Sequence, residues 1–144
     1  MPKVAVVMGS HKDFPAVEPC VKQLAALGIE VEARVLSAHR TPEEAAAFAR
    51  LAQENGIEVL IAAAGKAAHL AGVLAAYTVL PVIGLPIAAS QLDGMDALLA
   101  AQILGVKYPE IRAKLERGRA DMHDDVLLHD AEIAAKVADI VKGE

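Results

Sequence analysis

The sequence predicts a single α/β domain, residues 1–144, built on a doubly wound parallel sheet. Four short, mostly apolar runs alternate with stretches of helical spacing, at residues 3–8, 29–36, 57–64 and 79–87. Strands that are apolar without interruption are typical of parallel sheets covered on both faces. Strands and helices alternating in this order predict an open sheet with helices on both sides. A chain of 144 residues also fits one domain.

The first part of the chain predicts two strands and the helix between them. Lys3–Met8 is an apolar run that ends before a Gly-Ser pair, which indicates a strand followed by a turn. From Pro15 to Leu27 apolar residues recur every three or four positions, which predicts a helix that Gly28 ends. Ile29–Leu36 alternates apolar with charged residues, so we expect this strand nearer an edge of the sheet.

The middle of the chain predicts a second helix, two more strands and a third helix. Thr41 at the N-cap, with proline and two acids behind it, predicts a helix that runs to about residue 55. Ile57–Ala64 predicts a third strand, and His69–Tyr77 the helix after it. Val79–Ile87 predicts a fourth strand, because its two prolines stand near its ends, where strands tolerate them.

The last third of the chain predicts helices alone. Composition and spacing indicate helices at 96–104, 109–121 and 131–142, with a loop over the polar residues 121–130. The sequence shows no linker, internal repeat or low-complexity segment.

Composition excludes several classes of partner. The net charge is −5, and the chain has 2 Phe, 2 Tyr and no Trp, which argues against a nucleic-acid partner. No apolar run approaches the roughly 20 residues of a membrane helix, so we expect no membrane partner and a cytoplasmic protein. The single cysteine, Cys20, has no disulfide partner in the chain and is expected as a small buried hydrophobe. The abundance of alanine favours a homo-oligomer.

Three polar segments follow the predicted strands and converge on one edge of the sheet. They are Gly9–Asp13, Ser37–Pro42 and Ala64–Leu70. In open α/β sheets ligands bind outside the carboxyl ends of the strands. Each segment also precedes a helix, whose free N–H groups and dipole favour an anion. The sequence therefore predicts a site for a small phosphorylated ligand, with His39 as its chemical centre.

These segments, read as MGSHKD, SAHRTP and AGKAAHLAG, resemble the PurE family of purine-biosynthesis proteins. The similarity runs over residues 3–99 and resumes over 100–115. The resemblance implies a flavodoxin-like sheet and an octamer. It also implies an N5-carboxyaminoimidazole ribonucleotide mutase, which moves a carboxylate from the exocyclic nitrogen of its substrate to C4 of the imidazole. The small-molecule ribonucleotide is then the partner, and no metal, ATP or organic cofactor is needed in this step.

By this resemblance His39 is the general acid and base, a role for which histidine is suited because it titrates near neutrality. Arg40 is expected to hold a phosphate or carboxylate with its planar guanidinium. Ser37 is expected to contact the nucleotide, although a serine here also fits a simple turn.

The other two loops are expected to bind the ribonucleotide. In the first loop, Gly9, Ser10 and Asp13 match the nucleotide-binding loop of the family. Ser10 is expected to contact the phosphate and Asp13 the ribose hydroxyls, with a helix cap as the alternative role of Asp13. In the third loop, small residues let backbone N–H groups approach the ligand, and His69 orients the loop. The third-loop residues expected to bind are Gly65, Ala67, Ala68, His69 and Leu70.

The chain departs from the family pattern in four places. Lys12 replaces a serine, Lys66 a glycine and Ala71 a proline of the common bacterial forms. After Leu99 a strand-and-loop unit on the order of 30 residues is absent, so we expect a four-stranded sheet without the family's fifth strand. Two alternatives to the mutase stay open: a carboxylase that adds CO2 directly to aminoimidazole ribonucleotide, and a non-catalytic nucleotide-binding paralogue.

Overall fold

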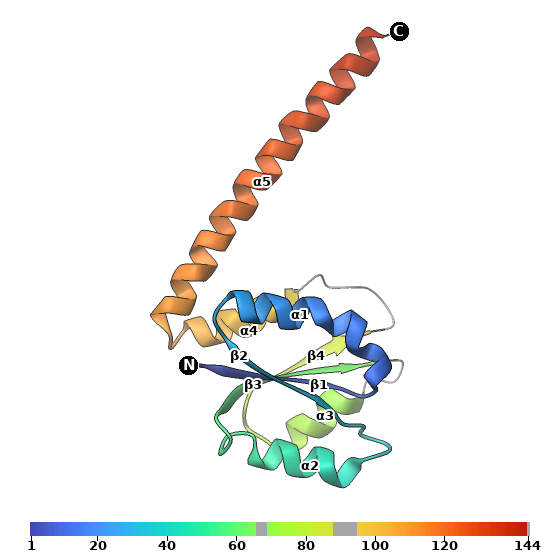
Figure 1. Ribbon diagram of the computed structural model, residues 1–144, viewed down its shortest axis with the longest axis vertical. Coiled ribbons are helices and arrows are strands. Elements are labelled where there is room, and N and C mark those ends of the chain that lie inside the picture. Colours follow the sequence, from blue (N-terminus) through green and yellow to red (C-terminus); the bar gives the residue numbers. More distant parts are fainter. Residues whose placement is uncertain (66–68, 88–94, 144) are drawn as a thin grey trace.

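The structure is a computed structural model that describes residues 1–65, 69–87 and 95–143 of the chain. Within these residues, four strands form one sheet in the order β2-β1-β3-β4, and every paired neighbour is parallel (Figure 1). The strands are β1 (Lys3–Met8), β2 (Glu30–Val35), β3 (Ile57–Ala64) and β4 (Val82–Pro86). The predicted doubly wound α/β fold is confirmed.

Helices cover both faces of the sheet (Figure 1). α1 and α4 lie on one face, and α2 and α3 lie on the other. A short 3-10 turn, η1 (His11–Asp13), precedes α1. The helices are α1 (Phe14–Ala26), α2 (Pro42–Leu51), α3 (His69–Ala76), α4 (Met95–Gly105) and α5 (Pro109–Lys142).

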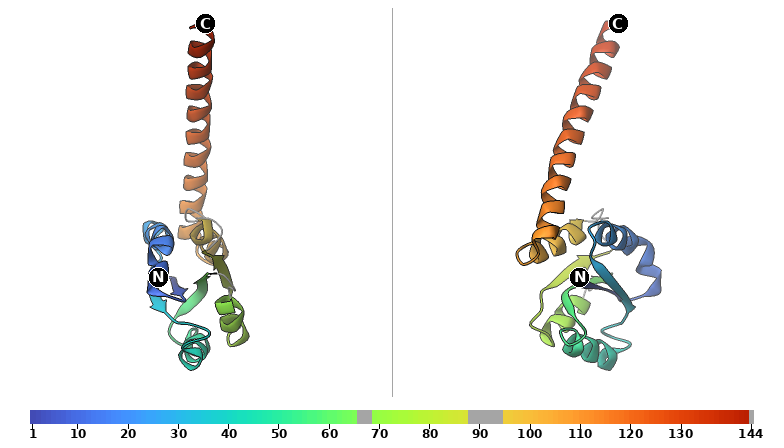
Figure 2. Two further views of the ribbon diagram at one scale, coloured as in Figure 1. Left: turned by 90° about the vertical axis from the view of Figure 1, so that its right-hand side faces the viewer. Right: turned by 60° about the vertical axis from the view of Figure 1, so that its left-hand side comes forward.

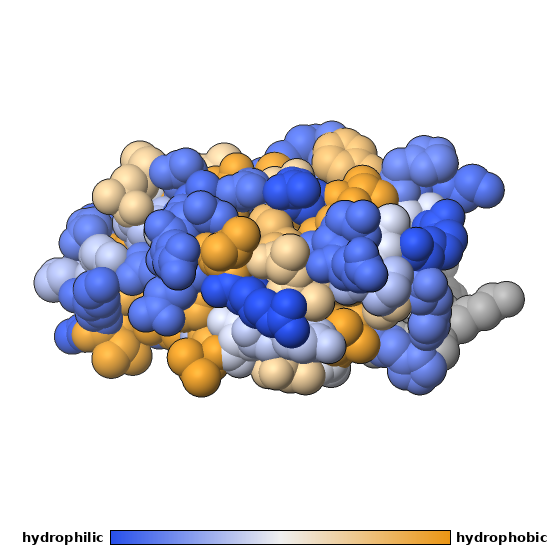
Figure 3. Space-filling view, turned by 90° about the horizontal axis from the view of Figure 1, so that it is seen from below, coloured by the Kyte–Doolittle hydropathy of each residue, from blue (hydrophilic) through white to orange (hydrophobic). Residues whose placement is uncertain are grey.

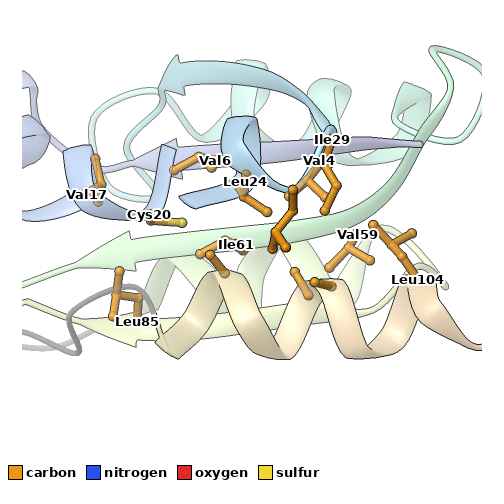
Figure 4. Close-up of a cluster of buried hydrophobic side chains, with 14 of the residues drawn as sticks. Val4, Val6, Val17, Cys20, Leu24, Ile29, Val59, Ile61, Leu85 and Leu104 are labelled. Carbon is orange, nitrogen blue, oxygen red and sulfur yellow. The ribbon is translucent and has the colours of Figure 1, made fainter. Parts of the chain in front are cut away.

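The two central strands divide the core between the faces. Alternate side chains of a strand point to opposite faces, so Val4 and Val6 pack under α1 and α4 while Ala5 and Val7 pack under α2 and α3. All four are 0% exposed. Figure 4 shows the first of these two clusters, where Leu24 of α1 meets strand residues from β1 and β3. The uninterrupted apolar runs are thus explained by burial on both faces.

Strand β2 lies at an edge, as its alternating pattern predicted. Its outer side chains form ion pairs, the closest joining Nζ of Lys3 to Oε2 of Glu32 at 2.7 Å. This hydrogen bond lowers the pKa of the Glu32 carboxyl and raises the pKa of the Lys3 ammonium. Charged side chains of this kind also protect an edge strand from pairing with other chains.

Strand β4 is the opposite edge of the described sheet, which fits the prediction of four strands. It begins at Val82, three residues later than the sequence predicted. The preceding residues form a turn in which the Leu80 N–H donates to Oγ1 of Thr78. Pro81 lacks an N–H, and only its carbonyl joins the sheet, by accepting from the N–H of Leu60.

The predicted loop at residues 121–130 is wrong, because the chain is helical throughout this segment. α5 runs from Pro109 to Lys142 as one helix of 34 residues. The polar residues suggested a loop, but the segment contains neither proline nor glycine, and each Asp or His costs a helix at most about 0.7 kcal/mol. Once its first turns are formed on the domain, each further residue extends the helix cooperatively.

The base of α5 is anchored to the domain. Nζ of Lys114 donates to the Leu27 carbonyl at the end of α1 (3.1 Å), and Nε of Arg112 donates to the Gly105 carbonyl at the end of α4 (2.9 Å). Ile111 is 1% exposed in the core. Among the described residues, no helix combines the length and hydrophobicity needed to cross a membrane.

We predict that Gly28→Ala destabilises the domain more than Gly56→Ala does. Both glycines have positive φ, 76° and 79°, so alanine costs each roughly 1–2 kcal/mol of backbone strain. At Gly28 the added Cβ would also lie 2.6 Å from Nζ of Lys114 and displace it from the Leu27 carbonyl, whereas nothing lies within 4 Å at Gly56. Urea unfolding of both variants measures the difference, and equal free energies of unfolding would contradict the role of Lys114.

Candidate active site

The carboxyl ends of the strands lie along one edge of the sheet, and hydrogen bonds extend the strand pairing into the loops. The Gly9 N–H donates to the Ala63 carbonyl (3.1 Å), which joins the loop after β1 to the end of β3. The Leu36 N–H donates to the Met8 carbonyl (2.9 Å), which joins the loop after β2 to the end of β1. The three predicted loops therefore begin side by side.

The loop after β2 is closed by a ring of hydrogen bonds between Ser37 and Thr41. Oγ1 of Thr41 accepts from the Ser37 N–H (2.9 Å) and donates to the Ser37 carbonyl (3.2 Å). Oγ of Ser37 accepts from the Arg40 N–H at 3.1 Å. Thr41 stands at the N-cap of α2, but its side chain makes no capping bond. Thr41 instead closes the loop that contains His39 and Arg40. The sequence analysis assigned Thr41 only as an N-cap and missed this role.

Arg40 connects this loop to the loop after β1. Its Nη2 donates to the Gly9 carbonyl at 2.8 Å. The side chain is otherwise on the surface, and a guanidinium has five N–H donors, so donors remain for a ligand. The S-x-x-x-T spacing of Ser37 and Thr41 is the sequence signal from which the closure of the loop after β2 could have been predicted, whereas no local pattern indicates the bond from Arg40 to Gly9.

His39 connects the same loop to the loop after β3. Its Nε2 lies 2.9 Å from Nδ1 of His69, and the two rings meet edge to face, with centroids 5.1 Å apart at 85°. One imidazole must donate in this bond and the other accept, so at least one ring is neutral while the bond exists. Two histidines that are 30 residues apart in sequence thus form one pair at the carboxyl edge.

The loop after β1 supplies Ser10 and Asp13. Oγ of Ser10 accepts from the Lys12 N–H at 3.3 Å, and the Asp13 N–H donates to the Ser10 carbonyl at 3.0 Å. Asp13 occupies the N-cap of α1, but its carboxylate makes no capping bond. The capping bond that the sequence analysis considered as an alternative role of Asp13 is therefore not made. Lys12 is exposed beside the site.

The third loop is described only at its two ends. Gly65 is exposed, and His69 begins α3. The side chain of Leu70 is 2% exposed in the core beneath the loop, so a contact from Leu70 to a ligand would come from its backbone. Ala67 and Ala68, like Lys66, lie outside the described residues. Within the described part of the chain, no group of three His, Cys, Asp or Glu could hold a metal ion.

The sequence of the chain is similar to those of a known protein family. Residues 3–100 match the family model described as AIR carboxylase. A relative from Pyrococcus abyssi is 46% identical over 85% of this chain and 84% of its own length. One from Saccharolobus solfataricus is 45% identical over 88% of this chain and 96% of its own length. Both are named N5-carboxyaminoimidazole ribonucleotide mutase.

The alignments indicate that this chain lacks a segment that its relatives have. The comparison with the Pyrococcus abyssi relative spans 147 positions, whereas 85% of the 144 residues here is about 122. About 25 of those positions therefore have no counterpart in this chain. The family match also ends at residue 100, next to the gap predicted after Leu99.

The fold is also similar to that of a solved structure. The crystal structure of Treponema denticola PurE superposes with a TM-score of 0.81 over 92% of this chain and 98% of that chain, at 22% sequence identity. The family model covers more than half of the chain, and the sequence relatives are well above 30% identical over most of their length. The chain belongs to the AIR carboxylase (PurE) family.

Proposed function

We propose that this chain is an N5-carboxyaminoimidazole ribonucleotide mutase of purine biosynthesis. The observation that supports it best is the convergence of the three loops on His39 and Arg40. His39 is hydrogen-bonded to the loop after β3, and its neighbour Arg40 is hydrogen-bonded to the loop after β1. The relatives that bear the name of the mutase are similar over most of the chain.

The reaction needs one group that can both give and take a proton. The carboxylate leaves the exocyclic nitrogen as CO2, and that nitrogen gains a proton. The CO2 then bonds to C4, which loses a proton, so the net change is one proton moved from C4 to nitrogen. A histidine that donates first and accepts second ends as it began, and we assign both transfers to His39.

The pair with His69 orients this histidine. The bond to His69 engages Nε2 of His39, and among the described residues Nδ1 has no hydrogen-bond partner. We assign the proton transfers to Nδ1, with His69 fixing the tautomer and direction of the ring. His69 is then a positioning residue rather than a group that touches the reacting atoms.

The remaining contacts would hold the ribonucleotide. Arg40 and Ser10 would bind its phosphate together with backbone N–H groups of the loops, including that of Gly65. Asp13 would accept from the ribose hydroxyls, and Ser37 would donate its hydroxyl to the nucleotide. Because small side chains allow close approach, Ala67 and Ala68 would contribute backbone N–H groups. No cofactor is required in this scheme.

We also propose that the chain acts as a cytoplasmic homo-oligomer, an octamer by family resemblance. The described surface bears apolar side chains that a monomer leaves in water, such as Val79 at 93% exposed and Val106 at 79%.

The first prediction is catalytic turnover itself. Carboxyaminoimidazole ribonucleotide labelled with 13C in its ring carboxylate should pass label to the exocyclic nitrogen, without exchange with dissolved CO2, when NMR follows the reaction. Label that equilibrates freely with dissolved CO2 would identify the direct carboxylase instead. Tight ribonucleotide binding without any movement of label would identify the non-catalytic nucleotide-binding paralogue.

The second prediction separates the two histidines. His39→Asn should lower turnover by about 10²- to 10⁴-fold and leave ribonucleotide affinity within a few-fold, since proton transfer is lost and the phosphate contacts remain. His69→Asn should lower turnover less, because His39 is still present but less well oriented. Equal losses of affinity and turnover in His39→Asn would refute its assignment as the acid and base.

The third prediction concerns Arg40. Arg40→Ala should weaken binding of aminoimidazole ribonucleotide roughly 10- to 100-fold, because a charge-assisted hydrogen bond and the link to Gly9 are both lost. Arg40→Lys keeps the charge but not the planar guanidinium, so its affinity should lie between those of the wild type and Arg40→Ala. Arg50→Ala is the control, since Arg50 is an exposed arginine of α2 that contacts the Tyr77 ring instead. Calorimetry measures the affinity of each variant for the ribonucleotide. Equal losses of affinity in Arg40→Ala and Arg50→Ala would contradict the assignment of Arg40.

A further inference from the structure

Most of helix α5 stands clear of the domain (Figure 2). Every described residue from Arg119 to Gly143 is exposed. Five large apolar side chains of this part lie on one face and are between 48% and 68% exposed. We call this face the α5 stripe, and it consists of Met122, Val126, Ile133, Val137 and Ile140.

The α5 stripe continues the face by which α5 packs on its own domain. Ile111 and Leu115 fall on the same helical face, and they pack into the core beside α4. Helices in proteins owe most of their stability to packing of an apolar face. The exposed part of α5 has such a face but no packing partner within its own described domain, so we expect its partner outside that domain. The opposite end of the molecule differs, since Figure 3 shows apolar side chains there scattered among polar ones.

We propose that the α5 stripe pairs with the same stripe of a second copy of this chain, in antiparallel orientation, about a two-fold axis between His129 and Asp130. The inference rests on the proposed self-association of the chain and does not depend on the chemistry assigned to His39. It names the surface through which two copies meet.

The spacing of the stripe is the first argument for this partner. Four of the five stripe positions are symmetric about its midpoint, because Val126 and Ile133 are equally far from it, as are Met122 and Val137. In an antiparallel pair, Val126 therefore faces Ile133 of the second copy and Met122 faces its Val137. A symmetric contact between identical subunits requires this kind of self-complementary surface.

The position of the domain is the second argument, and it decides the orientation. Because Ile111 and Leu115 pack on the domain, the domain occupies the stripe's face at the base of α5. A parallel pair would bring two domains into the same space, whereas an antiparallel pair puts them at opposite ends. Ile140 then comes level with Arg119 of the second copy. That residue borders a groove of about 380 Å³ between α4 and α5, together with Val106 and Leu115.

Charge is the third argument. The carbonyl end of α5, which is the negative end of its dipole, would lie near Arg119 of the second copy. Lys136 and Asp125 lie on the same flank of the stripe, 11 positions or about three turns apart, and in the antiparallel register each comes near the other in the second copy.

The test compares two substitutions at equally exposed positions. Ile133 in the stripe and Leu128 on the opposite side of α5 are both 57% exposed. Ile133→Glu should halve the number of subunits seen by light scattering at micromolar concentration, or reduce it further, while Leu128→Glu should leave that number unchanged. Circular dichroism checks that both variants keep their helix content. An unchanged mass for Ile133→Glu would overturn the α5 pairing but not self-association, and a monomeric wild type would overturn both.

Disulfide trapping tests the register independently of stability. In the antiparallel pair a cysteine at 126 faces a cysteine at 133, so the double variant Val126→Cys, Ile133→Cys should form covalent dimers under mild oxidation. Val126→Cys alone should not form them, because its counterpart in the second copy lies about two turns away. The native Cys20 is buried and stays in both variants. Covalent dimers of Val126→Cys alone would indicate a parallel pair and overturn the proposal.

Discussion

The pairing of β1 between β2 and β3 is the constraint on which the rest of this structure depends. Because all three strands run parallel, their carboxyl ends meet at one edge, and the loops that follow them start within hydrogen-bonding distance. The crossover from β2 over β1 to β3 places the change of direction beside β1, which is where ligands bind in open α/β sheets. The apolar side chains that hold this pairing lie on both faces of the sheet.

The loops then use the sheet as a fixed base for their own bonds. Thr41 closes the loop after β2, and this closure directs the adjacent His39 and Arg40 toward the loops on either side. A histidine pair and a guanidinium that spans two loops are held before any ligand arrives, which lowers the ordering cost of binding. The loops therefore present an imidazole pair and a guanidinium close together at the carboxyl edge of the sheet.

The described sheet ends at β4, and the residues described after Ile87 form the helices α4 and α5. The curated relatives have about 25 positions more than this chain in the aligned region. The core is nonetheless covered, because α4 packs across β3 and β4 and α5 is fixed at its base by Ile111 and Lys114. The consequence of this arrangement is a long helix that extends beyond the domain covering its first turns, with exposed apolar side chains along it (Figure 2).

The sequence by itself determined the strands, the fold class and the three polar loops, because uninterrupted apolar runs and N-terminal helix signals are local patterns. It also placed His39 and Arg40 in the site through their motif. Two features were decided by tertiary structure: the bond between His39 and His69, and the reach of Arg40 to the Gly9 carbonyl. Residues 121–130 were misread as a loop because polarity is a local signal, whereas the continuity of α5 depends on the turns already packed against the domain. Contacts between distant segments depend on how the strands are ordered in space, and spacing along the chain does not encode that order.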